Sequence, residues 1–232
     1  MIDWHSHVLP FMDDGSQSVD ESLQMLQILR DQGATSVIAT PHFLANSESV
    51  DSFLERRESS YRSLLGAIND SHPRILCGAE VKYYPGIAKM DNIKSLTIEG
   101  TNILLLEMSM SKWTEYTFKE LIELSGIRGL NIVLAHIERY LPVQGKEIFY
   151  RLRENGLFMQ VNASVFENFA WRRKALALID AGVVNFIGSD CHNLTSRAPN
   201  LSTAYNYISK KFGNEFLYQM AEFGESLLGL NQ

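Results

Sequence analysis

The chain has little of several residue types, and each shortage excludes a class of protein. Its 232 residues include two cysteines, Cys77 and Cys191, which lie in or beside apolar runs and are too few for a disulfide framework. So few cysteines are typical of a protein in a reducing compartment. No stretch approaches the about 18 uninterrupted apolar residues of a transmembrane helix, so we expect no membrane span.

Positive charge is also scarce. Lysine and arginine number 21 against 27 aspartates and glutamates, and the formal net charge is -6. The short basic runs at 55–57 and 172–174 are typical of solvated helix faces, so we expect no nucleic-acid-binding surface. The chain starts with Met1-Ile2-Asp3 and has no basic and apolar leader, which predicts a cytoplasmic protein.

Short apolar runs alternate along the chain with amphipathic segments. We expect a first helix that is capped by Ser18 and Glu21 and stopped by Gly33. Continuous apolar strands between helices predict a parallel sheet covered on both faces, and seven of them predict one α/β domain over residues 1–232, a seven-stranded or distorted TIM-type barrel. The expected strands are 2–5, 36–40, 74–80, 102–107, 131–136, 157–162 and 183–188, and the later helices are 50–67, 115–125, 144–154, 168–181, 201–210 and 213–228.

Five of the six histidines fall where a predicted strand ends. His5 and His7 form an H-x-H pair, whose imidazoles point to one face of a strand because side chains alternate. The pair alone is a weak signal, but other strand ends and the loops just beyond them carry further possible ligands. These are Asp14, His42, Glu80, Glu107, His136, Asp190 and His192. Because the carboxyl ends of barrel strands share one mouth, we predict a metal site there.

The chemistry of these nine side chains limits which ions they suit. Imidazole mixed with carboxylate, without thiolate, favours manganese, iron or zinc. Four carboxylates suit two or three ions, with one such as Glu80 bridging. Three divalent ions would outweigh the charge of four carboxylates, and the positive pocket that results would suit phosphate.

A second phosphatase signature overlaps the last of these motifs. Cys191 and Arg197 have the C-x5-R spacing of cysteine-dependent tyrosine phosphatases, in which a thiolate attacks phosphate. The intervening residues contain no glycine to let the backbone curl around an anion. Asp190 precedes the cysteine, and its negative charge would raise the pKa of the thiol. We therefore interpret the spacing as a coincidence.

The ordered motifs DWHSH, DDG, TPH, GAEV, LLEM, AHIERY and SDCHN resemble those of the PHP (polymerase and histidinol phosphatase) superfamily. Within it they are most similar to the bacterial manganese-dependent tyrosine phosphatases of capsule and exopolysaccharide biosynthesis. The resemblance covers essentially the whole chain. It implies a distorted barrel with three divalent ions, Mn²⁺ above all, with Fe, Co or Zn as alternatives. The implied partner is a phosphotyrosine-bearing protein, namely the tail of a bacterial tyrosine kinase.

The resemblance also implies roles for single residues. One ion would be held by His5, His7, Glu80 and Asp190, a second by Glu80, Glu107 and His136, and a third by Asp14, His42 and His192. Arg139 and Arg197 match two family arginines, and a guanidinium can clamp phosphate oxygens while metal-activated water attacks phosphorus. The chain departs from the family pattern at Trp4 and Ile137. Because neither position supplies a metal ligand, we expect these differences to affect substrate preference and not the chemistry.

Other interpretations stay open. Another PHP phosphoesterase, acting on histidinol phosphate or another small phosphomonoester, would use the same ions. A metal-dependent amidohydrolase also begins with H-x-H, but it commonly uses a bridging lysine, and no lysine ends a predicted strand. A scaffold in polysaccharide assembly would hardly need two arginines at the same mouth. The aromatic residues that follow two ligand-bearing strands fit either an entrance for a phosphotyrosine ring or ordinary loop packing: Tyr83, Tyr84, Trp113 and Tyr116.

Overall fold

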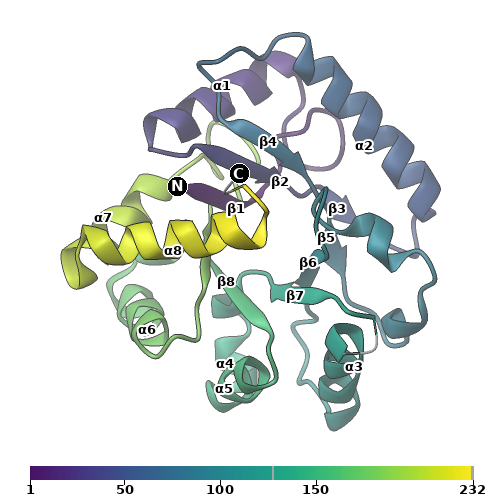
Figure 1. Cartoon of the computed structure of the whole chain (residues 1–232), viewed down its shortest axis with the longest axis vertical. Coiled ribbons are helices and arrows are strands. Elements are labelled where there is room, and N and C mark those ends of the chain that lie inside the picture. The colour runs from purple at the N-terminus through teal and green to yellow at the C-terminus, as the bar shows by residue number, and fades with distance from the viewer. Residues whose placement is uncertain (127, 231–232) are drawn as a thin grey trace.

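Parallel strands form a curled sheet with helices around its outside (Figure 1). The computed structural model describes residues 1–126 and 128–230. Hydrogen bonding orders the strands as β1-β2-β4 and as β3-β5-β6-β7-β8-β9. The strands are β1 (Ile2–Ser6), β2 (Ser36–Ala39), β3 (His42–Phe43), β4 (Arg74–Cys77), β5 (Glu80–Lys82), β6 (Ile103–Glu107), β7 (Asn131–Leu134), β8 (Phe158–Asn162) and β9 (Phe186–Gly188).

The prediction that 74–80 is one unbroken strand is wrong, because the run divides into β4 and β5, and the strand predicted at 36–40 ends one residue early and is followed by the separate short strand β3. Pro41 has no N–H for a ladder and separates β2 from β3, while Gly78 lies between β4 and β5. Pairing continues across both breaks, since Ala39 is in register with Cys77 and His42 with Glu80. The two strand groups are therefore continuous through these interrupted strands.

The first and last strands also lie side by side. The Asp190 N–H donates to His5 O (2.8 Å), and the His7 N–H donates to Cys191 O (2.9 Å). Because β1 also pairs with β2, it has parallel neighbours on both sides. The sheet is curled enough to bring the carboxyl ends of all these strands to one mouth.

The helices begin and end close to the expected residues. Ser18 Oγ accepts from the Glu21 N–H (3.0 Å), but the Glu21 carboxylate accepts from Gln17 N–H (2.8 Å), so the capping box is only half formed. Gly33 adopts a positive φ of 95° beyond the first helix, as expected for a stop signal. The helices are α1 (Val19–Asp31), α2 (Val50–Leu65), α3 (Glu115–Gly126), α4 (Leu141–Gln144), α5 (Glu147–Glu154), α6 (Phe169–Asp180), α7 (Leu201–Phe212) and α8 (Asn214–Leu227). Among the described residues, no helix is long and apolar enough to cross a bilayer.

Apolar side chains close the end of the sheet opposite the mouth. Trp4 is buried and stacks on Phe186, with ring centroids 3.7 Å apart. Strand residues such as Ile2 and Val133 join the same cluster, and Leu228 beyond the end of α8 packs against it. Helix α8 therefore covers one end of the strands (Figure 1), and the polar side chains are left to the other end.

A substitution at Gly224 of α8 tests the packing of this helix against Trp4 and Ile2. An added Cβ would lie 2.9 Å from Trp4 Cζ2 and 3.1 Å from Ile2 Cδ1. We expect Gly224→Ala to lower the free energy of unfolding by about 1–2 kcal/mol, because the overlap outweighs the helix propensity of alanine. Urea denaturation will measure the change.

Gly66 provides the matched control. It lies at the end of α2 in a right-handed conformation, and its added Cβ would meet nothing within 4 Å. We expect Gly66→Ala to raise the stability slightly, by about 0.4–1 kcal/mol. A gain of stability in both variants would contradict the close contact between α8 and Trp4.

Candidate metal centre

Strand β1 carries the H-x-H pair into the mouth of the sheet. His5 and His7 are buried, and their Nε2 atoms face each other at 3.1 Å. The predicted common orientation of the two imidazoles is therefore confirmed. Two basic nitrogens at this separation need a cation or a proton between or beside them.

Glu80 lies at the centre of the histidines and is only 1% exposed. Its Oε1 is 2.8 Å from His136 Nε2, and its Oε2 is 2.9 Å from His42 Nδ1. The same Oε2 lies 3.2 Å from His5 Nε2. No described residue gives this Oε2 atom a hydrogen bond of good geometry. It is therefore a buried carboxylate oxygen that lies close to several imidazoles but has no hydrogen-bond partner among them.

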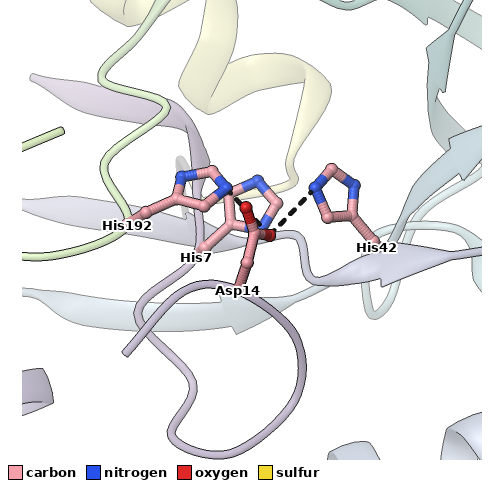
Figure 2. A group of neighbouring side chains, drawn as sticks. All are labelled: His7, Asp14, His42 and His192. Carbon is pink, nitrogen blue, oxygen red and sulfur yellow. Dashed lines mark ion pairs between the residues drawn. The ribbon is translucent and has the colours of Figure 1, made fainter. Parts of the chain in front are cut away.

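A second group surrounds Asp14, on the loop after β1. Figure 2 shows the Asp14 carboxylate between the rings of His42 and His192. Asp14 Oδ1 lies 3.4 Å from the Nε2 atom of each. His192 Nε2 is itself buried without a hydrogen-bond partner among the described residues. The ring of His7 lies behind this pair, with its centroid 3.7 Å from that of His192.

The structure brings all nine predicted metal ligands together. Within each of four overlapping groups, the possible ligand atoms lie within 4.8 Å of one another. The groups are His7-Asp14-His42-His192, His5-His7-Asp190, His5-Glu80-His136 and His42-Glu80-Glu107. The arrangement differs from the division that the sequence resemblance implies. His7 also joins the Asp14 group, and Glu80 groups with His5 and His136 instead of with His5, His7 and Asp190. Glu107 groups with His42 and Glu80 while lying 4.0 Å from His136.

Each buried histidine of the centre uses Nδ1 for a second contact and turns Nε2 inward. This pattern is typical of metal-binding histidines, because the contact on one nitrogen fixes the tautomer that leaves the other free to coordinate. The contacts of Nδ1 are His7 with Asp13 Oδ2 (2.7 Å), His136 with Tyr140 Oη (3.1 Å), His192 with Asp190 O (3.0 Å) and His5 with Gln160 Oε1 (3.5 Å).

The buried carboxylates and imidazoles shift one another's pKa values. Burial opposes ionisation of Glu80, but His5 and the other imidazoles hold the pKa of this carboxyl well below its usual value. Burial likewise opposes a charge on His5, but Glu80 and Asp190 outweigh it and raise the pKa of His5 to about 9. Burial lowers the pKa of His192 to about 4, with help from His7. The carboxylates therefore require positive charge at the centre of the site.

Two arginines meet the edge of this cluster at Asp190. The Nη2 atoms of Arg139 and Arg197 donate to opposite oxygens of the Asp190 carboxylate, in the case of Arg197 over 2.8 Å. Arg197 Nη1 also lies 3.5 Å from Asp14 Oδ2. The two side chains are 40% and 37% exposed, so their remaining N–H groups can reach an incoming anion.

Two ligand candidates adopt backbone conformations that side chains disfavour. His136 follows β7 with φ of 35°, and Asp190 follows β9 with φ of 52°. A positive φ costs a residue with a Cβ about 1–2 kcal/mol, and such conformations concentrate at functional sites. The hydrogen bond from His136 N–H to Gln160 Oε1 (2.7 Å) helps to hold the first of these turns.

Two residues that hold the ligand candidates, Asp13 and Gln160, were not predicted from the sequence. Asp13 accepts from His7 Nδ1 and, over 2.8 Å, from the His42 N–H, so it orients two ligand candidates from neighbouring strands. Gln160 performs the corresponding task for His136 and contacts His5. Their only signal in the sequence is weak: Asp13 precedes Asp14 in the DDG motif, and Gln160 is a polar residue within an apolar strand.

The rival C-x5-R interpretation fails on burial. Cys191 is fully buried, and its burial together with the charge of Asp3 raises the pKa of the thiol far above neutrality. A thiolate nucleophile needs the opposite environment. Asn162, which ends β8, donates to Asp190 Oδ2 (2.7 Å), whereas His72 contacts Asn69 in a loop away from the centre.

Comparisons with known proteins agree on one family. Residues 1–223 match the family model described as capsular polysaccharide synthesis, CpsB/CapC. The chain is 31% identical to the tyrosine-protein phosphatase YwqE of Bacillus subtilis over 98% of this chain and 91% of the relative. It is 28% identical to the tyrosine-protein phosphatase CpsB of Streptococcus agalactiae, over 98% of both chains.

The fold comparison gives the same result. A solved structure described as a unique metal-dependent tyrosine phosphatase, from work on YwqE of Bacillus subtilis and CpsB of Streptococcus pneumoniae, superposes with a TM-score of 0.84 and 27% identity. The match covers 100% of this chain and 96% of that chain. A lactonase of Listeria monocytogenes superposes with a TM-score of 0.51 at 13% identity, a likeness of fold alone.

Asp13 provides a test of how the centre is held. We expect Asp13→Ala to weaken Mn²⁺ binding by about 10–100-fold, because His7 loses the partner that fixes its tautomer and the loop loses its hold on His42. A calorimetric titration of the chelator-stripped protein with Mn²⁺ will measure the affinity. Asp91→Asn, at an exposed position, should bind as the unaltered protein does. Equal affinities in both variants would refute the orienting role of Asp13.

Proposed function

The chain belongs to the CpsB/CapC family of capsular polysaccharide synthesis, and we propose that it is a metal-dependent protein-tyrosine phosphatase. One observation carries the proposal: nine imidazole and carboxylate side chains converge beside two arginines that are free to bind an anion. Such a site combines a place for divalent cations with a clamp for phosphate oxygens. Neither a binding scaffold nor a thiol-dependent phosphatase needs both.

The residues present fit divalent metal ions. The unsatisfied buried atoms Glu80 Oε2 and His192 Nε2, and the facing Nε2 atoms of His5 and His7, are the kind of donors that a cation would satisfy. We propose that the nine residues hold three ions, with Glu80 shared between sites, and that Mn²⁺ is the native metal, with Fe, Co or Zn as substitutes. The proposed ligands are His5, His7, Asp14, His42, Glu80, Glu107, His136, Asp190 and His192.

Such ions, when bound, supply Lewis acidity toward the phosphoryl group and a water activated for attack on phosphorus. The chain supplies orientation and charge. Arg139 and Arg197 share the Asp190 carboxylate, which fixes both guanidinium planes at the edge of the centre. From there their free N–H groups can donate hydrogen bonds to the equatorial oxygens of the phosphate as negative charge develops on them. No protein nucleophile is required.

The fold suits a PHP enzyme. If β2 with β3 and β4 with β5 are each taken as one interrupted strand, the curled sheet has the seven strands of a distorted (β/α)7 barrel, and β1 lies beside the chain after β9. We propose this description for a single domain over residues 1–232, of which 127, 231 and 232 lie outside the described residues. The active site then occupies the carboxyl ends of the strands, where barrel enzymes place it.

The relatives act on phosphotyrosine according to their names, and the family is defined by capsule synthesis. We therefore propose that the substrate is a phosphotyrosine-bearing protein of that system, namely the tail of a bacterial tyrosine kinase on the cytoplasmic side of the membrane. The same ions and arginines would also serve another phosphomonoesterase, so the substrate must be tested directly.

The proposed function predicts dependence on metal and a preference among phosphate esters. The protein stripped with a chelator and then restored with Mn²⁺, Co²⁺, Zn²⁺ or Mg²⁺ should be assayed on phosphotyrosine, phosphoserine and histidinol phosphate side by side. We expect activity to disappear on chelation, to return best with Mn²⁺ and to be highest on phosphotyrosine. Preference for histidinol phosphate would replace the proposed substrate, and activity that survives thorough chelation would refute the mechanism.

Cys191 separates the metal mechanism from a thiol mechanism. We expect Cys191→Ser to retain kcat/KM within about threefold, because the thiol is buried and its pKa is raised, so it takes no part in the reaction. The substituted hydroxyl is similar in size, and circular dichroism will check that the variant is folded. Complete loss of activity in a folded variant would contradict hydrolysis by metal-activated water.

A further inference from the structure

A pocket of about 440 Å³ opens beyond the ends of β3 and β5, and none of its lining residues is a proposed metal ligand. Its walls come from two segments, each of which directly follows a strand that carries a proposed metal ligand. The lining residues are Leu44, Ala45, Asn46, Lys82, Tyr83 and Tyr84. Most of this lining is apolar or aromatic, unlike the rest of the mouth.

The pocket lies next to the metal centre along the chain and through Lys82. Leu44 lies two residues after His42, and Lys82 and Tyr84 lie two and four residues after Glu80. Lys82 is the last residue of β5, so its side chain points to the same face as Glu80, while Leu44 and Tyr84 lie within two residues of the ends of β3 and β5. The ammonium of Lys82 marks the boundary, since its Nζ lies 2.9 Å from Glu107 Oε2.

One wall of the pocket is held rigidly. The Tyr83 hydroxyl donates to Glu120 Oε2 (2.6 Å), and the Gly86 N–H donates to the other oxygen of the same buried carboxylate (2.6 Å). The loop after β5 is thereby tied to α3. Because the Tyr83 hydroxyl is committed to Glu120, what this residue offers the pocket is the apolar part of its ring.

The two sides of the mouth differ in polarity. Arg139 and Arg197 reach the centre from the segments after β7 and β9, whereas the apolar pocket lies after β3 and β5. Glu80, on the strand that leads into the pocket, contacts His136, which shortly precedes Arg139 along the chain. A phosphate monoester of a phenol has the same polarity, with a dianion at one end and an aromatic ring at the other.

We propose that this pocket binds the aromatic ring of the phosphotyrosyl side chain and is the subsite that selects aryl over alkyl phosphates. The inference rests on the proposed function and adds to it the residues that set the substrate class. With the phosphate held at the arginines and the metal centre, the ring extends away from the arginines and lies against Leu44 and Tyr84. The side chain of phosphoserine carries no ring to make these contacts.

Two variants with exposed or half-buried positions test the subsite. We expect Leu44→Ala and Tyr84→Ala each to lower kcat/KM for phenyl phosphate by about tenfold, because an aromatic contact in a pocket is lost. The kcat/KM for ethyl phosphate should change by less than about twofold, since its short chain does not fill the pocket. Comparing each variant with the unaltered protein on the same substrate cancels the difference in leaving group.

Matched substitutions outside the pocket serve as controls. Leu65→Ala and Tyr218→Ala remove the same side chains at exposed positions on α2 and α8 and should leave both substrates unaffected. Leu65 borders Arg74, where β4 begins, so it lies at the opposite end of the strands. An equal loss on phenyl and ethyl phosphate in the pocket variants, or no loss on either, would overturn the proposal.

A binding measurement keeps the subsite testable apart from turnover. Calorimetry on the Mn²⁺-loaded protein should give phenylphosphonate about tenfold tighter binding than methylphosphonate, with the preference lost in Leu44→Ala and Tyr84→Ala. Equal binding of the two phosphonates by the unaltered protein would refute the ring subsite. Absence of hydrolysis of every phosphomonoester, with the phosphonate preference intact, would instead refute the phosphatase while leaving the aryl subsite in place.

Discussion

The buried carboxylate of Glu80 is the constraint around which the rest of the mouth is organised. Its two oxygens are surrounded by four imidazoles that come from β1, β3 and β7 or the residues just after them, and burial of this charge is tolerable only where positive charge lies at the same point. In the described structure the raised pKa values of His5 and His7 meet that demand with protons. A divalent ion meets it more completely, because it interacts with all the inward-turned nitrogens at once. Metal binding and the stability of the mouth are therefore expected to be linked.

The fold contributes by concentrating polar groups at one end of a curled sheet. The apolar cluster around Trp4 and Phe186, covered by α8, fills the opposite end. The interruptions at Pro41 and Gly78 then allow β3 and β5 to pair as short separate strands, so that His42 and Glu80 lie side by side. The departure from the family at Trp4 thus concerns packing at the closed end and lies away from the substrate.

The sequence was sufficient to predict the ligand candidates and most strands, because both depend on local patterns: apolar runs and the polar residues that end them. It was insufficient for Asp13 and Gln160, whose roles exist only once segments distant in sequence meet at His7, His42 and His136. The break within 74–80 was missed because only Gly78 and Ala79 separate the apolar run of β4 from β5. The positive φ of His136 and Asp190 has no signal in residue type, since neither is glycine.

The two arginines and the apolar pocket lie on different sides of the mouth, and this separation affects how the substrate class of such an enzyme can change by substitution. The arginines and the ligands are coupled through Asp190, which contacts both, so a change on that side disturbs the charge balance of the whole centre. Leu44 and Tyr84 carry no charge and lie in segments beyond the strand ends, where substitution leaves the ligands in place. Substrate class can then change on the side of β3 and β5 while the chemistry on the side of β7 and β9 stays constant. The buried Glu80 connects the two sides through the ligand candidates, because it groups both with His136, which shortly precedes Arg139, and with His42, which shortly precedes Leu44.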